Sequence, residues 1–171
     1  MNEQVILQPS EYGSFYSGYI NHAKGKDILN SLMTQVDDLS AYFLTKGEEW
    51  SMKAYAPGKW TPKELLGHMI DCDRIMAYRA LCIARGETKS LPGYDQDVYM
   101  EGMDFNSVAL VDLLEDLSHE RKAVVSMIKT WPQEVFMRIG RANDSAVSVR
   151  ALLHIIVGHT EHHFQVLKER Y

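Results

Sequence analysis

Four long segments of the sequence repeat apolar side chains every three to four positions, the spacing of one face of an α-helix. We predict helices over residues 28–46, 62–85, 107–130 and 149–169. Few segments show the alternation of a strand, and no linker or internal repeat divides the 171 residues. The pattern therefore predicts an all-α fold, an up-down or related four-helix bundle, as one domain over residues 1–171.

Local signals place the ends of these helices. Thr61-Pro62-Lys63-Glu64 is a capping box with proline at the first helical position, the clearest start signal in the chain. The other expected ends are the N-caps Asp27, Ser107 or Asn106, and Ser148, and the stops Gly47, Gly86 and Trp131-Pro132.

The remaining segments carry weaker signals. Residues 1–26 hold an aromatic series that suits a short helical wrap on the core: Tyr12, Phe15, Tyr16 and Tyr19. Residues 132–147 look irregular, with a short extended piece at residues 135–137. On the third helix the inward stripe is predicted to be Val108, Val111, Leu114, Leu117, Val124, Val125 and Ile128.

Charge and composition narrow the function classes. The net charge of -5 argues against nucleic acid or an anionic membrane surface as a partner. No apolar run approaches the ~20 residues that span a bilayer, and the first residues do not resemble a cleaved signal peptide. Cys72 and Cys82 lie about 15 Å apart on one predicted helix, too far for a disulfide. Free thiols indicate a cytoplasmic protein.

The last helix carries histidines at core positions. Because each residue turns a helix by about 100°, His159 and His163 continue the face of Leu152, Ile155 and Ile156. His68, on the second helix, also lies on the apolar side. If the second and last helices are neighbours, three neutral imidazoles converge and can hold a divalent metal with open positions. Two hydrogen-bonded core histidines are the alternative for His159 and His163.

The other histidines have no such setting. His154 and His162 fall on a flank of the last helix and are predicted to be boundary or surface residues. His22 and His119 are expected to be structural or surface residues. Thr160 stands where a HExxH zinc protease has its glutamate, so that class is excluded.

Three stretches resemble the DinB/YfiT-like superfamily of metal-binding four-helix bundles: "APGKWTPKELLGHMIDCDRIMAYRALCIARGE", "LPGYDQD" and "SVRALLHIIVGHTEHHFQVLKERY". The resemblance covers the chain from about Tyr12 to Tyr171. It implies a metal held by one histidine of the second helix and an HxxxH pair of the last, which fall on His68, His159 and His163. It also implies a thiol-dependent S-transferase, because characterised relatives use low-molecular-weight thiols, and a homodimer, as in some relatives.

The resulting prediction is one divalent ion, zinc with nickel as the alternative, and a low-molecular-weight thiol as cosubstrate for a small-molecule substrate. Asp71 would orient a ligand or act as a base, and Arg79 would bind a substrate carboxylate; a solvated aspartate and an ion-paired arginine are the alternatives. Asp95 and Asp97 are candidates for the mouth of the site. Cys72 is more typical of a small core residue than of a fourth ligand. A metal-dependent hydrolase and a non-catalytic, stress-related dimeric bundle remain open.

Overall fold

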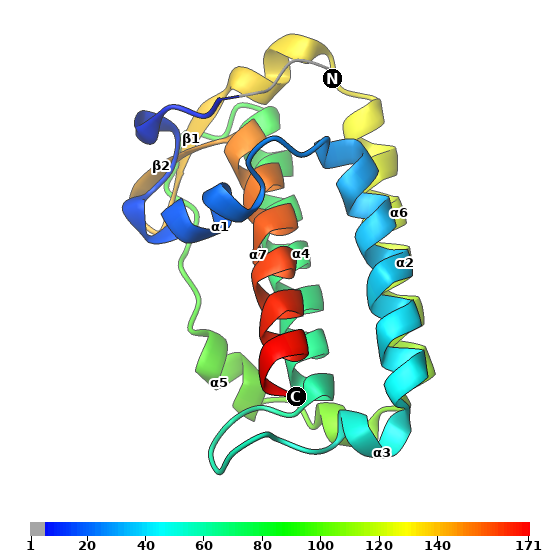
Figure 1. The fold of residues 1–171 in the computed structure, drawn as a ribbon. Helices are drawn as coiled ribbons and strands as arrows, with labels where there is room; N and C mark the ends of the chain where they lie inside the picture. Colours follow the sequence, from blue (N-terminus) through cyan, green and yellow to red (C-terminus); the bar gives the residue numbers. More distant parts are fainter. Residues whose placement is uncertain (1–5) are drawn as a thin grey trace.

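The computed structural model describes residues 6–171, an all-α four-helix bundle with one small β-hairpin (Figure 1). The long helices are α2 (Ile28–Lys46), α4 (Pro62–Ala84), α6 (Leu110–Lys129) and α7 (Val149–Arg170). The predicted all-α four-helix bundle is confirmed, in the related form rather than the strictly up-down one, and the largest difference in helix bounds is at the start of α6, predicted at 107 and observed at 110. Across residues 6–171, none of the helices combines the length and the apolarity needed to cross a membrane.

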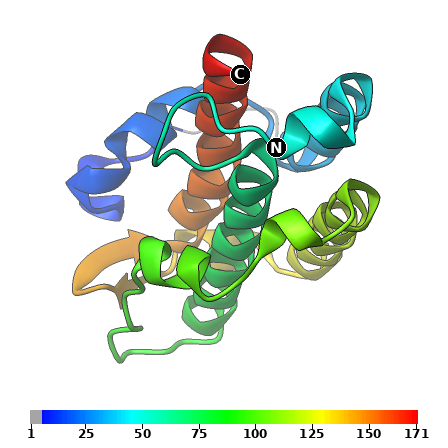
Figure 2. The ribbon, with the colours of Figure 1, turned by 90° about the horizontal axis from the view of Figure 1, so that it is seen from below.

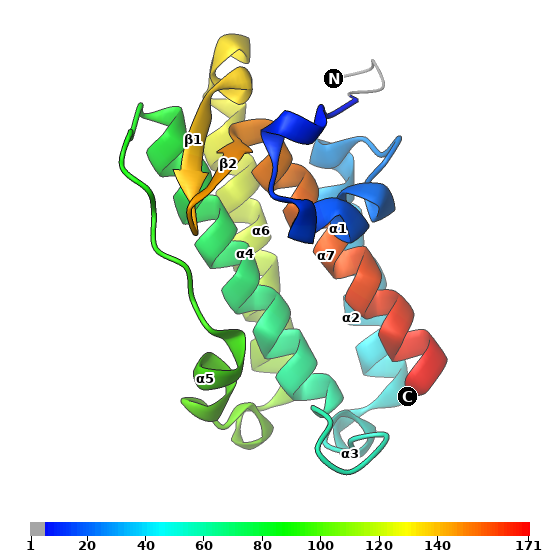
Figure 3. The ribbon, with the colours of Figure 1, turned by 90° about the vertical axis from the view of Figure 1, so that its left-hand side faces the viewer.

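The bundle does not alternate in direction from one helix to the next. α2 and α7 run one way and α4 and α6 the other, so that two parallel helices follow each other in the chain order (Figure 1). Seen from the end, α4 stands beside α7 and α2 beside α6 (Figure 2). The connection from α4 to α6 therefore runs the length of the bundle, along the outer side of α4 (Figure 3). This topology makes α4 and α7 neighbours, as the histidine argument requires.

Short elements fill the connections. They are η1 (Pro9–Glu11), η2 (Ser14–Tyr16), α1 (Ser17–His22), α3 (Glu48–Ser51), α5 (Gln96–Glu101), η3 (Phe105–Ser107), η4 (Gln133–Met137), β1 (Ile139–Ala142) and β2 (Ser145–Ser148). The N-terminal segment and the hairpin lie on the side of the α4–α7 pair that faces away from α2 and α6 (Figure 2).

Most predicted helix ends are confirmed. The Thr61 hydroxyl accepts from the Glu64 N–H at 3.2 Å, and the Glu64 carboxylate accepts from the Thr61 N–H at 2.6 Å. Asp27 caps α2 through the Asn30 N–H, and Ser148 caps α7 through the Ala151 N–H. These caps are local hydrogen bonds between residues three apart, which is why the sequence predicts them.

The predicted cap of α6 is wrong. Asn106 and Ser107 lie in η3, and the N-cap residue Ala109 has no side chain to accept a hydrogen bond. Glu48, from α3, accepts from the Leu110 N–H at 3.0 Å instead. The buried ammonium of Lys63 donates to the Val108 carbonyl at 2.6 Å. Tertiary partners therefore satisfy the backbone that a local cap was expected to satisfy.

The predicted stripe of α6 is wrong at one end and incomplete in its middle. Val111 is 59% exposed, because the buried face of α6 begins with Leu110 and Leu113 and each residue turns the helix by about 100°. Arg121 occupies a core position with no exposed surface, although it falls in a polar run of the sequence. The carboxylate of Asp73, on α4, compensates this buried charge.

Residues 132–147 hold more structure than predicted. Residues 135–137 form part of the 3₁₀-helix η4 rather than an extended piece. The extended residues follow, as β1 paired with β2 across a two-residue turn. Asn143 and Asp144 form this turn at φ of 47° and 57°, values that asparagine and aspartate tolerate and that favour a tight hairpin. Ala142 also pairs with Leu91, which fixes the α4–α6 connection to the hairpin.

The predicted N-terminal wrap is present from residue 6 onward; residues 1–5 lie outside the described residues. α1 packs along α7, so that α7 is covered by the bundle on one side and by α1 on the other (Figure 3). His154, on α7, is 7% exposed, so its predicted boundary position is wrong. Its Nδ1 lies 2.7 Å from the Arg150 carbonyl oxygen, which provides the partner that a buried imidazole needs.

Glu11 ties this wrap to the start of α7. The Arg150 guanidinium donates to both carboxylate oxygens, at 2.7 and 2.5 Å, and the Ser148 hydroxyl donates at 2.9 Å. Burial alone would raise the pKa of the Glu11 carboxyl, but hydrogen bonds from Arg150, Gln8 and Ser148 outweigh it and lower the pKa from 4.5 to about 2.

We therefore predict that Glu11→Gln lowers the free energy of unfolding by about 2–4 kcal/mol near neutral pH. A carboxyl with a lowered pKa in the folded state stabilises the fold above its unfolded pKa and ceases to do so as the pH falls toward 2. The difference between wild type and variant, measured by urea unfolding, should therefore shrink between about pH 5 and about pH 2. A pH-independent difference would contradict this assignment.

Candidate metal centre

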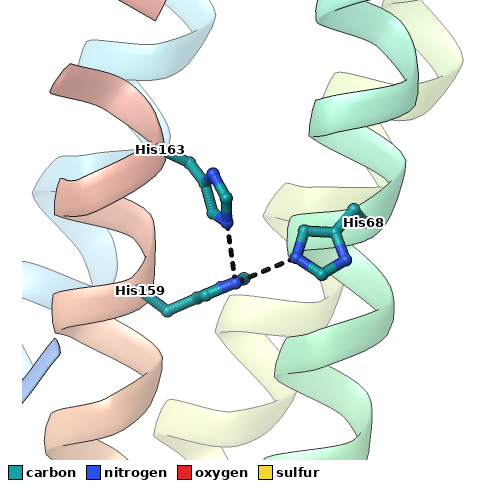
Figure 4. Close-up of side chains that lie close together, drawn as sticks. All are labelled: His68, His159 and His163. Atoms are coloured by element: carbon teal, nitrogen blue, oxygen red, sulfur yellow. Dashed lines mark hydrogen bonds between the residues drawn. The ribbon is translucent and has the colours of Figure 1, made fainter. Parts of the chain in front are cut away.

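Three histidines from two neighbouring helices meet inside the bundle. His68 comes from α4, and His159 and His163 come from successive turns of α7 (Figure 4). The His159 Nε2 atom lies 3.0 Å from the His68 Nε2 and 2.9 Å from the His163 Nε2. One ring nitrogen from each residue falls within 4.8 Å of the other two. The structure thus brings together the three predicted ligands, and no carboxylate or thiol joins the group among residues 6–171.

Hydrogen bonding alone cannot satisfy this arrangement. A ring nitrogen carries either one hydrogen or one lone pair, yet His159 Nε2 faces two other nitrogens. A cation at the shared point accepts all three lone pairs. Two zinc–nitrogen bonds of about 2.0–2.1 Å at a tetrahedral angle separate their nitrogens by roughly 3.3 Å, close to the observed spacings. The donor set therefore fits a divalent ion.

Burial keeps the three rings neutral, the state that a metal ligand requires. His68 and His159 are 3% exposed. Burial lowers the pKa of His68 to about 4 and that of His163 to about 3, and it holds the pKa of His159 well below its ordinary value. Neutral ligands add no charge, so a bound ion would keep its full positive charge.

Aromatic side chains pack against two of the three rings. Tyr19 meets His159 edge-on at 5.1 Å between centroids, and Trp60 lies 4.9 Å from His68. The Nδ1 atoms of His159 and His163 are buried without a hydrogen-bond partner in the described part of the chain. No hydrogen bond at Nδ1 therefore helps to orient these two rings, as one often does for a histidine that binds a metal. Sequence reasoning assigned Tyr19 to packing alone and missed Trp60, which precedes the α4 capping box without a signal of its own.

A buried polar network supports α7 next to the histidines. The Arg121 guanidinium donates to Asp73 at 2.5 Å, to Gln35 at 3.1 Å and to Thr160 at 2.6 Å. Each of the four long helices supplies one of these residues. Burial raises the pKa of Asp73 to about 6 even though Arg121 opposes the shift. Because Thr160 follows His159, the network fixes the rotation of α7 at the site.

A cavity of about 690 Å³ reaches the centre at His159. Five segments enclose it: the N-terminal segment with α1, the middle of α4, the loop before α5, the hairpin turn and α7. Its walls include Tyr16, Tyr19, Tyr94, Cys72 and Arg79. The volume is in the range of sites for small molecules. The site therefore combines three convergent histidine nitrogens with a cavity large enough for a small molecule.

The cavity includes some of the other predicted site residues. Arg79 lines it, and so does Asp95, whose Oδ1 accepts from two backbone N–H groups of α5. Asp97 is exposed and does not line the cavity, although its charge acts on His68. Cys72 is buried in the cavity wall, as expected of a core residue, and burial raises the pKa of its thiol to about 12.

Asp71 and the remaining histidines lie outside the cluster. Asp71 is half-buried beside Arg74, and burial raises the pKa of its carboxyl. It does not belong to the histidine group, and its predicted catalytic role stays a prediction. His162 is half-buried, with its ring 4.9 Å from that of His163, and His22 lies 5.7 Å from His162. His119 is exposed.

Comparison with known proteins agrees with this architecture. No curated protein matches the chain in sequence. In structure, the chain is similar to YfiT from Bacillus subtilis, which is described as a probable metal-dependent hydrolase with an unusual four-helix bundle topology. The TM-score is 0.72 at 16% sequence identity, over 98% of this chain and 92% of that chain. The family model of the DinB superfamily matches residues 31–167, which include all three histidines. The chain therefore belongs to the DinB superfamily.

Proposed function

We propose that the protein is a metal-dependent enzyme that transfers a low-molecular-weight thiol to a small electrophile. The observation that carries the proposal is the set of three neutral Nε2 ligands beside a cavity of about 690 Å³. A divalent ion bound there would lower the pKa of a coordinated thiol from about 8.5 and leave it ionised at neutral pH. We propose zinc as that ion, with nickel as the alternative.

The side chains have defined roles in this proposal. The three histidines hold the ion without neutralising it, and Tyr19 and Trp60 exclude water from two of the ligand rings. The cavity positions the electrophile. The thiol proton passes to solvent when the thiol binds; the sulfur then forms a bond to the electrophilic carbon, and the leaving group departs with its electron pair. No protein base is needed, because the thiol is already ionised.

This last point favours thiol transfer over hydrolysis. A hydrolase that activates water commonly places a general base within hydrogen-bond reach of the reacting water. In the described residues no carboxylate joins the three ligand nitrogens. Hydrolysis remains the second candidate because the charge of Asp97 acts on His68, and because the structurally similar YfiT is described as a probable hydrolase. Metal binding without catalysis is the third candidate function.

A fluorogenic conjugation assay tests the proposal. Monochlorobimane, which loses chloride when a thiol attacks it, is incubated with a panel of thiols: cysteine, glutathione, bacillithiol and mycothiol. We expect at least one thiol to react at a rate that scales with protein, falls to background with chelator and returns with zinc or nickel. The His163→Ala variant should be inactive and His162→Ala should be active.

The other candidates give different results in the same experiment. If no thiol shows chelator-sensitive conjugation, the proposed thiol transfer is wrong. Chelator-sensitive hydrolysis of ester or amide probes, lost in His163→Ala, would then establish the hydrolase. Metal binding without either activity would leave the non-catalytic role.

A further inference from the structure

Arg79 is a buried arginine that has no acidic partner among residues 6–171. It is 2% exposed on α4 and lines the cavity. Its Nη2 donates to the Pro92 carbonyl at 2.8 Å, and its Nη1 lies 3.7 Å from the Met76 sulfur. Its guanidinium carbon lies 5.7 Å from the centroid of the Tyr94 ring. No carboxylate oxygen of residues 6–171 lies within 4.0 Å of its nitrogens, so the ion pair expected as the alternative is not formed there.

The other arginines in protected positions do have such partners. Arg121, with no exposed surface, pairs with Asp73 at 2.5 Å. Arg150 pairs with Glu11 at 2.5 Å. Withdrawing a guanidinium from water is unfavourable unless an anion or several acceptors replace the water. One carbonyl, one thioether and the face of one aromatic ring replace that water only in part, and no described residue supplies an anion for the Arg79 charge.

The cavity offers a place for that partner. Arg79 and His159 line the same cavity, and Arg79 lies eleven residues beyond His68 on α4, about 16 Å along the helix axis. Asp95 is the carboxylate among the described lining residues, and its Oδ1 already accepts from the N–H groups of Asp97 and Val98. A small molecule that reaches from the histidines along α4 would present its far end to Arg79.

We propose that Arg79 binds a carboxylate of the thiol substrate while the sulfur lies at the three histidines. This inference rests on the proposed thiol transfer and narrows it to acidic thiols long enough to span the cavity. The guanidinium donates two parallel hydrogen bonds to a carboxylate, which a lysine at the same position cannot do. The proposal therefore assigns Arg79 to substrate selection, separate from the metal ligands.

Binding to the Co²⁺-loaded protein tests this assignment, with the sulfur-to-cobalt charge-transfer absorption as the signal. The probes are mercaptoalkanoates of increasing chain length and the mercaptoalkanols of the same lengths. We expect the longer carboxylates to bind about tenfold to hundredfold more tightly than the matched alcohols, and the short ones to show no preference. Equal affinity of the two series at every length in the wild type would overturn the proposal, whether or not any variant folds.

The variants separate charge from geometry. In Arg79→Gln the longer carboxylates should bind about as tightly as the matched alcohols, so that their affinity ratio is near one. Arg79→Lys should retain part of the wild-type preference for the carboxylates. Arg85→Gln is the matched control, because Arg85 ends the same helix, is exposed and does not line the cavity. Arg85→Gln should keep the wild-type ratio of carboxylate affinity to alcohol affinity. An undiminished ratio in Arg79→Gln would assign the preference to another residue and overturn the proposal.

A second series distinguishes failure of this inference from failure of the proposed function. Alkane dicarboxylates are compared with their monomethyl esters by thermal shift of the metal-loaded protein. If no thiol produces a charge-transfer band but the dicarboxylates retain an Arg79-dependent advantage, thiol transfer is wrong and the carboxylate site stands. If both thiol series bind with equal affinity, thiol binding stands and the carboxylate site is wrong.

Discussion

Replacing His163 with alanine is expected to reduce bound metal from about one divalent ion per chain to a small fraction of that. The remaining His68 and His159 supply two nitrogens, and no carboxylate or thiol in the described part of the chain lies close enough to replace the third. Loss of an outer partner typically costs 10–100-fold in metal affinity, so loss of a direct ligand should cost at least about 100-fold. Elemental analysis of protein purified without chelator measures the effect.

His162→Ala is the matched control for this variant. His162 neighbours His163 in the sequence and contacts its ring, but it does not belong to the ligand group. Its replacement removes a histidine of the same helix turn and should leave about one ion per chain. His68→Ala tests the contribution of α4 independently. Undiminished metal in His163→Ala, or an equal loss in His162→Ala, would refute the ligand assignment.

The part of the site that could be predicted depends on local spacing. His159 and His163 share one helix face because four residues separate them, and the Thr61 box fixes the start of α4 and hence the face of His68. The pairing of α4 with α7 is the one non-local assumption in that prediction, and the bundle confirms it.

The parts that could not be predicted depend on non-local contacts. Periodicity predicts neither Arg121 nor His154 as buried, because no local pattern shows that Asp73 will neutralise Arg121 or that tertiary packing will bury His154. The Glu48 cap of α6 crosses 62 positions in the sequence. In each case the partner lies far along the chain, and periodicity reports only which side of one helix is apolar.

Gly158 is one position whose structural role the helical periodicity does not reveal. A Cβ built there would lie 1.8 Å from the Tyr19 carbonyl oxygen and 2.6 Å from the Tyr19 carbonyl carbon. Both are backbone atoms of α1, so no side-chain rotation can relieve the contact. The close approach of α1 to α7 therefore requires glycine at this position, one residue before His159.

We predict that Gly158→Ala destabilises the fold by roughly 2–4 kcal/mol, although alanine favours a helix by about 1 kcal/mol over glycine. The overpacking outweighs the helix preference because α1 as a whole must move. Gly18→Ala is the control: Gly18 lies in α1 with nothing within 4 Å of its Cβ position, so alanine should leave stability unchanged or raise it by up to about 1 kcal/mol. Urea unfolding compares the two variants, and equal stability of Gly158→Ala and wild type would show that α1 does not need this contact.

The same variant should also affect the metal centre, because α1 carries the Tyr19 ring that packs on His159. A displaced α1 would open the cavity wall at Tyr19 and admit water to a ligand that is 3% exposed. We therefore expect metal to pass to a chromogenic chelator faster from Gly158→Ala than from wild type, under conditions where both are folded, and at the wild-type rate from Gly18→Ala. Unchanged release from Gly158→Ala would mean that the bundle helices alone control access to the three histidines.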